Sequence, residues 1–228
     1  MFGPAVAVTL LSIPPLLLIK YLNYKSNKLS NTLQQEVNKD QFKYMFVTHK
    51  NRLCSPHLNT RLICGTNCSY LYLKNILNLI NQAQESVCVA MYHLSLDDIY
   101  HAILNAHNRG VHVRVIADLV MLTTFGNRVN KLFSKDVPAK APKIRFGLMH
   151  HKFMLIDQKN ATNAKVLYGS LNYTVNALIN NWEFVLLTNS AHIVKRFSDE
   201  FEFLWDNENF AYLGTSNVEI QDASSTEV

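Results

Sequence analysis

Two histidines and a lysine stand directly before a hydrophobic segment in the stretch MHHKFMLID, which ends at Asp157. Because alternate residues of an extended chain share a face, His150 and Lys152 should point the same way and His151 the other way. A neutral imidazole beside an ammonium group suits attack on a phosphodiester. The imidazole nitrogen is the nucleophile, and Lys152 neutralises charge on the phosphate oxygens. His151 is interpreted as an ordinary strand-end histidine.

Further polar residues follow in the segments GSLN, which begins at Gly169, and NWE, which ends at Glu183. Glycine allows the backbone to approach a ligand closely. Ser170 and Asn172 share a strand face and offer uncharged hydrogen-bond donors to phosphate oxygens. Glu183 could hold the second nitrogen of a catalytic imidazole and fix its tautomer, as the aspartate of a hydrolase triad does.

Together these segments resemble the signature of the phospholipase D superfamily, H-x-K-x4-D followed by G-S-x-N. The resemblance covers roughly residues 70–206. It implies that His150, Lys152, Asp157 and Glu183 are catalytic and that Ser170 and Asn172 bind the phosphate. Two departures concern the surroundings of the motif. The segment between Asp157 and Gly169 is longer than usual, which a polar hairpin loop explains, and Tyr173 stands where the family often has tryptophan.

The chain carries one copy of this motif, whereas the superfamily uses two. One copy supplies the nucleophile and the other supplies the acid for the leaving group. One histidine cannot serve on both sides of the same phosphorus, so we expect a two-fold homodimer that brings His150 of each subunit to a shared site. The resemblance implies a phosphohistidine intermediate. No metal is expected in the chemistry, because Lys152 and Asn172 stabilise the charge.

Three cysteines and a histidine cluster ahead of this region as Cys54, His57, Cys64 and Cys68. Three thiolates and one imidazole make a closed tetrahedral site for structural zinc. Reduced cysteines without a metal are the alternative, because the spacing C-x2-H-x6-C-x3-C does not by itself identify a zinc site. Cys88 lies apart in an apolar run that reads as a buried strand.

The first 19 residues carry no charge, and Lys20, Lys25 and Lys28 follow at once. An apolar stretch of this length could just span a bilayer, and a positive flank on its C-terminal side would keep the body in the cytosol. We therefore expect a membrane anchor kinked by Pro14 and Pro15. A cleaved signal peptide lacks its usual flanks here, and the proline pair disfavours a buried soluble helix.

Charge is unevenly distributed, although the net formal charge is only +5. From Phe197 onward there are eight acids and no Lys or Arg, so the preceding part carries 22 bases against 9 acids. Such a body suits an anionic partner such as nucleic acid, anionic lipid or a phosphorylated substrate. The basic run from Arg128 to Lys152 could line a groove for single-stranded RNA, rest on anionic phospholipid or simply be solvated. Leu119–Leu122 and Phe125 could form an apolar entrance for acyl chains.

Helix-like and strand-like segments alternate from Tyr70 onward, which predicts an α/β fold with a mixed or largely parallel sheet between helices. Strands are expected at 86–94, 111–118, 143–146, 152–157, 164–170 and 183–188, with helices at 70–84, from Ser95 to Gly110, at 174–180 and at 192–205. The expected division is an anchor at 1–20, a polar linker or membrane-proximal helix at 21–45, the Cys/His-rich segment at 46–69, a catalytic domain at 70–206 and a disordered acidic tail at 207–228.

The anchor, the cysteine cluster and the wording MHHKF, GSLNYT and NNWE are similar to the Zucchini-type, mitochondrial phospholipase D-like family, also known as mitochondrial cardiolipin hydrolases. This resemblance implies a single-pass dimer on the mitochondrial outer membrane with its catalytic domain facing the cytosol. Of the activities it implies, we favour a single-strand endoribonuclease that matures piwi-interacting RNA over a cardiolipin hydrolase that makes phosphatidic acid. A catalytically silent scaffold is a third interpretation, which the intact site residues disfavour.

Overall fold

The structure is a computed structural model that describes residues 14–37, 41–144 and 147–214 of the chain. It divides into two units, residues 1–39 and residues 40–228. Residues 1–13, which make up most of the predicted anchor, lie outside the described residues, as does most of the predicted acidic tail. The catalytic motif and the cysteine cluster both lie in the second unit.

The first unit contains one described helix, α2 (Pro15–Val37). Proline suits the first turn of a helix because its missing N–H would have no partner there. The carbonyl of Pro14 accepts from the amides of Leu17 and Leu18. Pro15 thus begins the described helix, and the predicted kink at the proline pair concerns a segment that lies outside the described residues. Among the residues described, no helix combines the length and apolar content that a membrane crossing needs.

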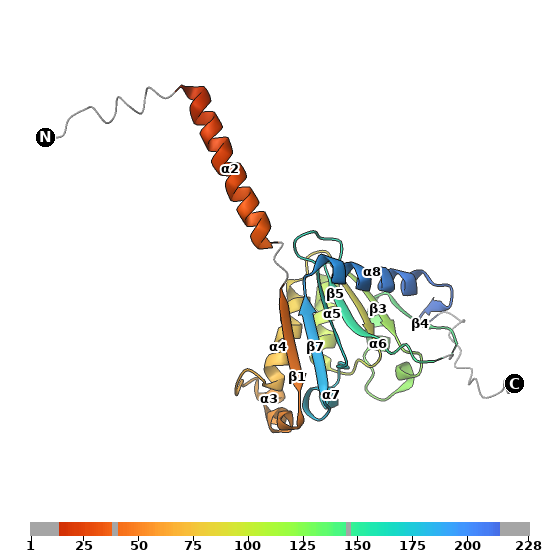
Figure 1. The fold of residues 1–228 in the computed structure, drawn as a ribbon. Helices are drawn as coiled ribbons and strands as arrows, with labels where there is room; N and C mark the ends of the chain where they lie inside the picture. The colour runs from red at the N-terminus through yellow and green to blue at the C-terminus, as the bar shows by residue number, and fades with distance from the viewer. Residues whose placement is uncertain (1–13, 38–40, 145–146, 215–228) are drawn as a thin grey trace. The chain divides into compact units, whose positions relative to one another are not determined.

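The second unit is built on one mixed sheet of eight strands in the order β1-β7-β6-β5-β2-β3-β4-β8 (Figure 1). β2 pairs with β3 and β3 with β4 in parallel, and the other neighbours are antiparallel. The strands are β1 (Phe42–Val47), β2 (Ser86–Met91), β3 (His112–Ala117), β4 (Ala139–Pro142), β5 (Lys152–Ile156), β6 (Lys165–Gly169), β7 (Glu183–Thr188) and β8 (Phe210–Tyr212).

Helices cover both faces of the sheet, as the alternation of elements predicted (Figure 1). Residues of α4 and α5 form one core with Val87 and Val89 of β2, while Cys88 and Ala90 face a second core under α8. The helical segments of this unit are η1 (His49–Cys54), α3 (Ser55–Thr60), α4 (Ser69–Gln82), α5 (Asp97–Asn108), η2 (Met121–Thr123), α6 (Val129–Phe133), α7 (Val175–Ile179) and α8 (Ala191–Asp206).

Four predicted positions or boundaries differ from the structure. The strand expected at 143–146 lies earlier, at β4, where Ala139 and Ala141 are buried between β3 and β8. β1 begins inside the predicted linker, and β8 lies inside the predicted acidic tail. Helix α5 starts at Asp97 with Leu96 at its N-cap, so Ser95 is not the cap, although Gly110 ends this region with φ of +87° as expected.

Candidate active site

The strand order brings together five of the six predicted catalytic and phosphate-binding residues, all except Asp157. β5, β6 and β7 are neighbours and run antiparallel in turn, so the start of β5, the end of β6 and the start of β7 meet at one edge of the sheet. His150 and Lys152 lie at the start of β5, Ser170 and Asn172 follow β6, and Glu183 begins β7. Antiparallel pairing thus gathers groups that are up to 33 residues apart in the sequence.

His150 and Lys152 are in direct contact. The ammonium Nζ of Lys152 lies 3.1 Å from the imidazole Nε2 of His150 and donates to the His150 carbonyl at 3.0 Å. His151 points the other way, and its Nε2 lies 3.0 Å from the carboxylate of Glu200 on α8. The expected facing of the three side chains is therefore present, with His150 and Lys152 on one side and His151 on the other.

The surroundings of His150 favour its neutral form. Partial burial and the positive charge of Lys152 lower the pKa of the imidazole, while the carboxylate of Asp118 opposes them. Burial likewise lowers the pKa of Lys152, and the negative charge of Glu183 partly restores it. A neutral imidazole has the lone pair that a nucleophile needs, so the pair is suited to attack on an electrophilic centre.

Tyr92 is a neighbour of the pair that the sequence patterns did not single out. Its ring lies 4.6 Å from the His150 ring in an edge-on arrangement, and Nζ of Lys152 lies 5.0 Å from the same ring. The backbone amide of Tyr92 donates to the carbonyl of His151, which fixes it beside β5. Its position directly after the apolar run of β2 was a signal, because polar rings at a strand end often mark a site.

Glu183 contacts Ser170 rather than an imidazole of its own chain. Ser170 donates to one carboxylate oxygen at 2.5 Å, and the amide of Asn181 donates to the other at 2.9 Å. The amide nitrogen of Phe184 donates to Ser170 Oγ at 3.1 Å. In the part of the chain that the structure describes, Oδ1 of Asn172 is buried without a hydrogen-bond partner. Ser170, Asn172 and Glu183 thus form a group of polar side chains at the same end of the sheet as Lys152.

Asp157 lies at the far end of β5 from His150. Its carboxylate accepts from the backbone amides of Gln84, Glu85 and Ser86 at 2.7–3.2 Å, and its φ is +50°. The side chain is 2% exposed. The structure thus places this motif aspartate where it ties β5 to the start of β2, and not in contact with the other site residues.

A cavity of about 600 Å³ opens beside His150 and His151. Its apolar walls include Leu148, Met149, Leu204 and Phe210, and its polar side chains besides the two histidines are Asn207 and Asn209. No Lys, Arg, Asp or Glu is among the described residues that line it. The predicted apolar entrance is only partly available, because Leu119 is buried and Leu122 packs on the core, whereas Phe125 is fully exposed.

The basic run from Arg128 to Lys152 does not form one continuous set of available cations. The guanidinium of Arg128 forms an ion pair with Asp97, and Lys140 donates to the carbonyl of Trp205. Lys131 and Lys135 are exposed. Two members of the run therefore stabilise the fold, which the sequence pattern could not distinguish from a binding role.

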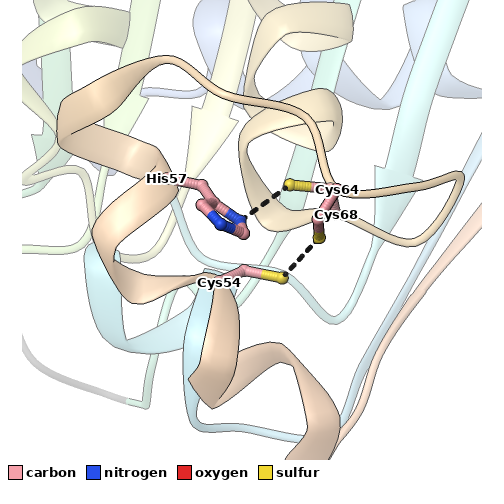
Figure 2. Close-up of side chains that lie close together, drawn as sticks. All are labelled: Cys54, His57, Cys64 and Cys68. Carbon is pink, nitrogen blue, oxygen red and sulfur yellow. Dashed lines mark hydrogen bonds between the residues drawn. The ribbon is translucent and has the colours of Figure 1, made fainter.

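The four predicted metal ligands converge from η1, α3 and the loop before α4 (Figure 2). Their ligand atoms all lie within 4.8 Å of one another. Sγ of Cys54 lies 3.7 Å from Sγ of Cys64, and Sγ of Cys68 lies 3.5 Å from Nδ1 of His57. Tetrahedral zinc with Zn–S bonds of about 2.3 Å separates its ligand atoms by roughly 3.5–3.8 Å, so the donor set fits zinc.

The cluster also separates the protonation states of its thiols. Burial raises the pKa of Cys68, but backbone amides and His57 outweigh it and lower the pKa to about 6. Hydrogen bonds with Cys54 and Cys68 raise the pKa of Cys64 to about 11. The lowered pKa favours the thiolate form of Cys68 at neutral pH, and this is the form that binds a metal ion.

A family model described as "Cardiolipin synthase, PLD-like domain" matches residues 76–205. Among curated proteins, the mitochondrial cardiolipin hydrolase of Xenopus tropicalis is 38% identical over 130 residues, which cover 57% of this chain and 59% of the relative. The protein of the same name from Danio rerio is 30% identical over 173 residues, covering 75% and 70%. The match to the human protein is 30% identical and covers 64% and 56%. The chain therefore spans less than two thirds of the frog and human relatives.

Solved structures share the fold. The phospholipase D family member Nuc from Salmonella typhimurium superposes with a TM-score of 0.57 at 19% identity, over 76% of this chain and 98% of Nuc. NucT from Helicobacter pylori gives 0.56 at 20% identity, over 76% and 99%. At these identities the likeness concerns the arrangement of strands and helices.

Proposed function

Because the chain belongs to the family of phospholipase D-like domains, we propose that it is a phosphodiesterase with His150 as its nucleophile. The observation that carries this proposal is the contact of 3.1 Å between Nε2 of His150 and Nζ of Lys152 at the edge of the sheet. The lowered pKa of His150 supports a neutral imidazole, and we expect the ammonium of Lys152 to turn to the phosphate oxygens when substrate binds.

The proposed reaction has two displacements at phosphorus. In the first, Nε2 of His150 forms a bond to phosphorus while the bond to the leaving oxygen breaks, and His150 of the partner subunit gives that oxygen a proton. In the second, His150 of the partner subunit takes a proton from water, the water oxygen bonds to phosphorus and the P–N bond breaks. Lys152, Ser170 and Asn172 bind the phosphate oxygens throughout.

A homodimer is part of this proposal, because a single chain offers one such histidine on the proposed site. The reaction needs a neutral imidazole and a protonated imidazole at the same time. When two copies of His150 share a site, they titrate in two steps with different pKa values. One copy can then be neutral while the other is protonated. Within the chain Glu183 accepts a hydrogen bond from Ser170, and in the proposed dimer it would face the imidazole of the partner subunit.

For the substrate we propose a phospholipid of the cardiolipin class, with phosphatidic acid as product. The supporting observation is the cavity of about 600 Å³ beside His150, whose described lining residues are mostly apolar and include no Lys, Arg, Asp or Glu. Acyl chains suit such walls, whereas the repeated phosphates of RNA do not. The curated relatives carry the name cardiolipin hydrolase, which agrees with this choice.

Single-stranded RNA is the second candidate, and it was the one favoured by the sequence. Exposed aromatic side chains support it, because Trp182, 70% exposed, directly precedes Glu183. Phe125 is fully exposed next to Thr124, whose hydroxyl lies 3.5 Å from His93. Aromatic rings at an active site can stack bases of a single strand. RNA is placed second because the described residues of the cavity carry no charged side chain, and because Arg128 and Lys140 are engaged in structural contacts.

We further propose a structural zinc ion held by the four residues Cys54, His57, Cys64 and Cys68, with no part in the phosphodiester chemistry. Bound zinc would cross-link η1 to the loop before α4. For location we propose the mitochondrial outer membrane, with a single N-terminal span and the catalytic unit in the cytosol. The names of the relatives and the apolar N-terminal sequence support it.

The test compares substrates with one preparation of the full-length chain. Cardiolipin liposomes and labelled single-stranded RNA are each incubated with wild type, His150→Ala and the control His112→Ala, which changes an exposed histidine at the start of β3. We expect release of phosphatidic acid by wild type and by His112→Ala but not by His150→Ala. Cleavage of RNA alone would replace the lipid with the second candidate, and cleavage of neither would favour a scaffold without activity.

A further inference from the structure

Asp118 is a buried carboxylate at the end of β3 that has no place in the motif of the family. Its side chain is 1% exposed. Oδ1 accepts from the backbone amides of Val120 at 3.0 Å and Met121 at 3.2 Å, and Oδ2 accepts from the amide of Met149 at 2.9 Å. Every oxygen thus receives a hydrogen bond from a backbone group, and the two oxygens serve different segments of the chain.

The second of these segments is the one that carries the nucleophile. Met149 directly precedes His150 and is itself buried, with 6% exposure. β2 lies between β3 and β5 in the sheet, so the carboxylate reaches past the end of β2 to hold the entry to β5. A hydrogen bond to a charged acceptor is among the stronger ones in proteins and fixes backbone geometry accordingly.

We propose that Asp118 is a positioning residue for the phosphodiesterase reaction, one that fixes the backbone before His150 and sets a negative charge beside its imidazole. The part that concerns turnover rests on the proposed function. The part that concerns the imidazole rests on the hydrogen bond from the Met149 amide to Asp118, directly before His150, and on the effect of the Asp118 charge on the imidazole. The two parts can therefore be measured separately.

Asp157 provides a matched comparison for a role that is only structural. It is also a buried aspartate, 2% exposed, and it also accepts from three backbone amides. It lies at the opposite end of β5, beside Gln84, Glu85 and Ser86 rather than beside Met149. Loss of either carboxylate leaves buried amides unsatisfied and should destabilise the fold to a similar degree. Only loss of Asp118 should alter the reactive histidine.

The groups that face His150 determine whether its pKa rises or falls when the charge of Asp118 is removed. Lys152 and His151 disfavour a positive charge on the imidazole, the ring of Tyr92 packs against it, and Asp118 is the negative group that favours the charge. Glu183 acts on Lys152. Removing the charge of Asp118 therefore lowers the pKa of His150 further. The acid limb of the pH–rate profile, where the nucleophile becomes protonated, should then move to lower pH.

The experiment uses the full-length chain as wild type, Asp118→Asn, Asp157→Asn and Asp118→Glu. The His150 imidazole is titrated by NMR, with its signal assigned by its absence in His150→Ala. Hydrolysis of the chromogenic diester bis(4-nitrophenyl) phosphate is measured across pH. For Asp118→Asn we expect a lower His150 pKa, an acid limb moved to lower pH, and kcat reduced roughly tenfold with little change in KM. Asp157→Asn should titrate like wild type.

An unchanged His150 titration and unchanged kcat in folded Asp118→Asn would overturn the proposal, as would equal pKa changes in both asparagine variants. If Asp118→Asn does not fold, Asp118→Glu decides, because it keeps the charge but misplaces the acceptor for Met149. Lowered kcat with an unmoved acid limb then supports the proposal, and wild-type kcat contradicts it. If wild type itself fails to hydrolyse the diester, the proposed function fails while the NMR titration still judges the placement of the charge.

Discussion

At the scale of single residues, the site depends on a contact between two groups that would repel each other if both were charged. Nζ of Lys152 and Nε2 of His150 are 3.1 Å apart, so protonation of the imidazole costs more than it would in water. The negative charge of Glu183 raises the pKa of Lys152 against the effect of burial, which favours the charged ammonium. In this arrangement Lys152 is the charged member of the pair and His150 the neutral one.

The lowered pKa of His150 makes a prediction about pH. The imidazole attacks in its neutral form, so activity is present above its pKa and is lost as the pH falls through that value. Because the pKa is lowered, the acid limb of kcat/KM should lie below the ordinary histidine value of 6.5. A pH series with bis(4-nitrophenyl) phosphate measures it, and an acid limb at or above 6.5 would contradict the electrostatic account of the pair.

A second prediction concerns Tyr92, whose ring contacts both members of the pair. Tyr92→Phe keeps the ring and should retain kcat within about twofold. Tyr92→Leu removes the edge-on and cation–π contacts, worth about 0.5–2 kcal/mol, and should lower kcat by roughly twofold to thirtyfold. Steady-state kinetics of the two variants gives the comparison. Equal rates for Phe and Leu would show that the ring does not position His150 and Lys152.

At the scale of elements, hydrophobic patterning predicted most strands and helices of the catalytic unit, including the short β6 and α7, but missed β4 and β8. The runs of β2, β5 and β7 and the amphipathic α4 and α8 lie where their periodicity indicated. β4 escaped prediction because AKAP has weak strand propensity and is stabilised by pairing with β3 and β8. Such pairing is tertiary and leaves no local signal in the sequence.

The candidate site shows the same division between local pattern and tertiary placement. Motif spacing predicted that His150 and Lys152 face one way and His151 the other, because strand alternation is a local property. It did not predict that Asp157 binds the backbone at the opposite end of β5, or that Tyr92 and Asp118 stand beside the nucleophile. Those placements depend on which strands become neighbours in the sheet.

A third prediction concerns the close approach of β6 and β7 at Gly169. A Cβ at this position would lie 2.1 Å from the carbonyl oxygen of Phe184, and backbone cannot move aside as a flexible side chain can. Gly169→Ala should lower the free energy of unfolding by about 3 kcal/mol. Gly147→Ala, where a Cβ meets nothing within 4 Å, is the control. Urea unfolding measures both, and similar stabilities would show that the strands separate easily.

At the scale of the whole molecule, the second unit contains both the proposed active site and, apart from it, the proposed zinc-binding segment. α7, which follows Asn172 and Tyr173 in the sequence, is tied to this segment, because Ser69 donates to the carbonyl of Leu178 at 2.6 Å and Asn51 donates to Ser69. Hydrogen bonds of Ser69 and Asn51, which lie close to the cysteine cluster in the sequence, thus hold the helix that follows the proposed phosphate-binding residues.

The fourth prediction separates metal binding from chemistry. The purified chain should contain about one zinc per subunit, and Cys64→Ser should lose it, because Cys64 is one of the four proposed ligands. Cys88→Ser, which changes a buried cysteine outside the cluster, should keep the metal. Elemental analysis and thermal unfolding measure content and stability. Zinc-free wild type with an unchanged Tm would show that the cluster is a set of reduced cysteines.

The central claim is that His150 of one subunit becomes covalently bonded to phosphorus while His150 of the partner subunit acts as acid. Intact-mass spectrometry of the native dimer, quenched during turnover of bis(4-nitrophenyl) phosphate, tests it most directly. We predict a nitrophenylphosphoryl adduct, mapped to His150 by peptide analysis and present on at most one subunit of each dimer. No adduct under turnover at any quench time, or an adduct that persists in His150→Ala, would contradict the account.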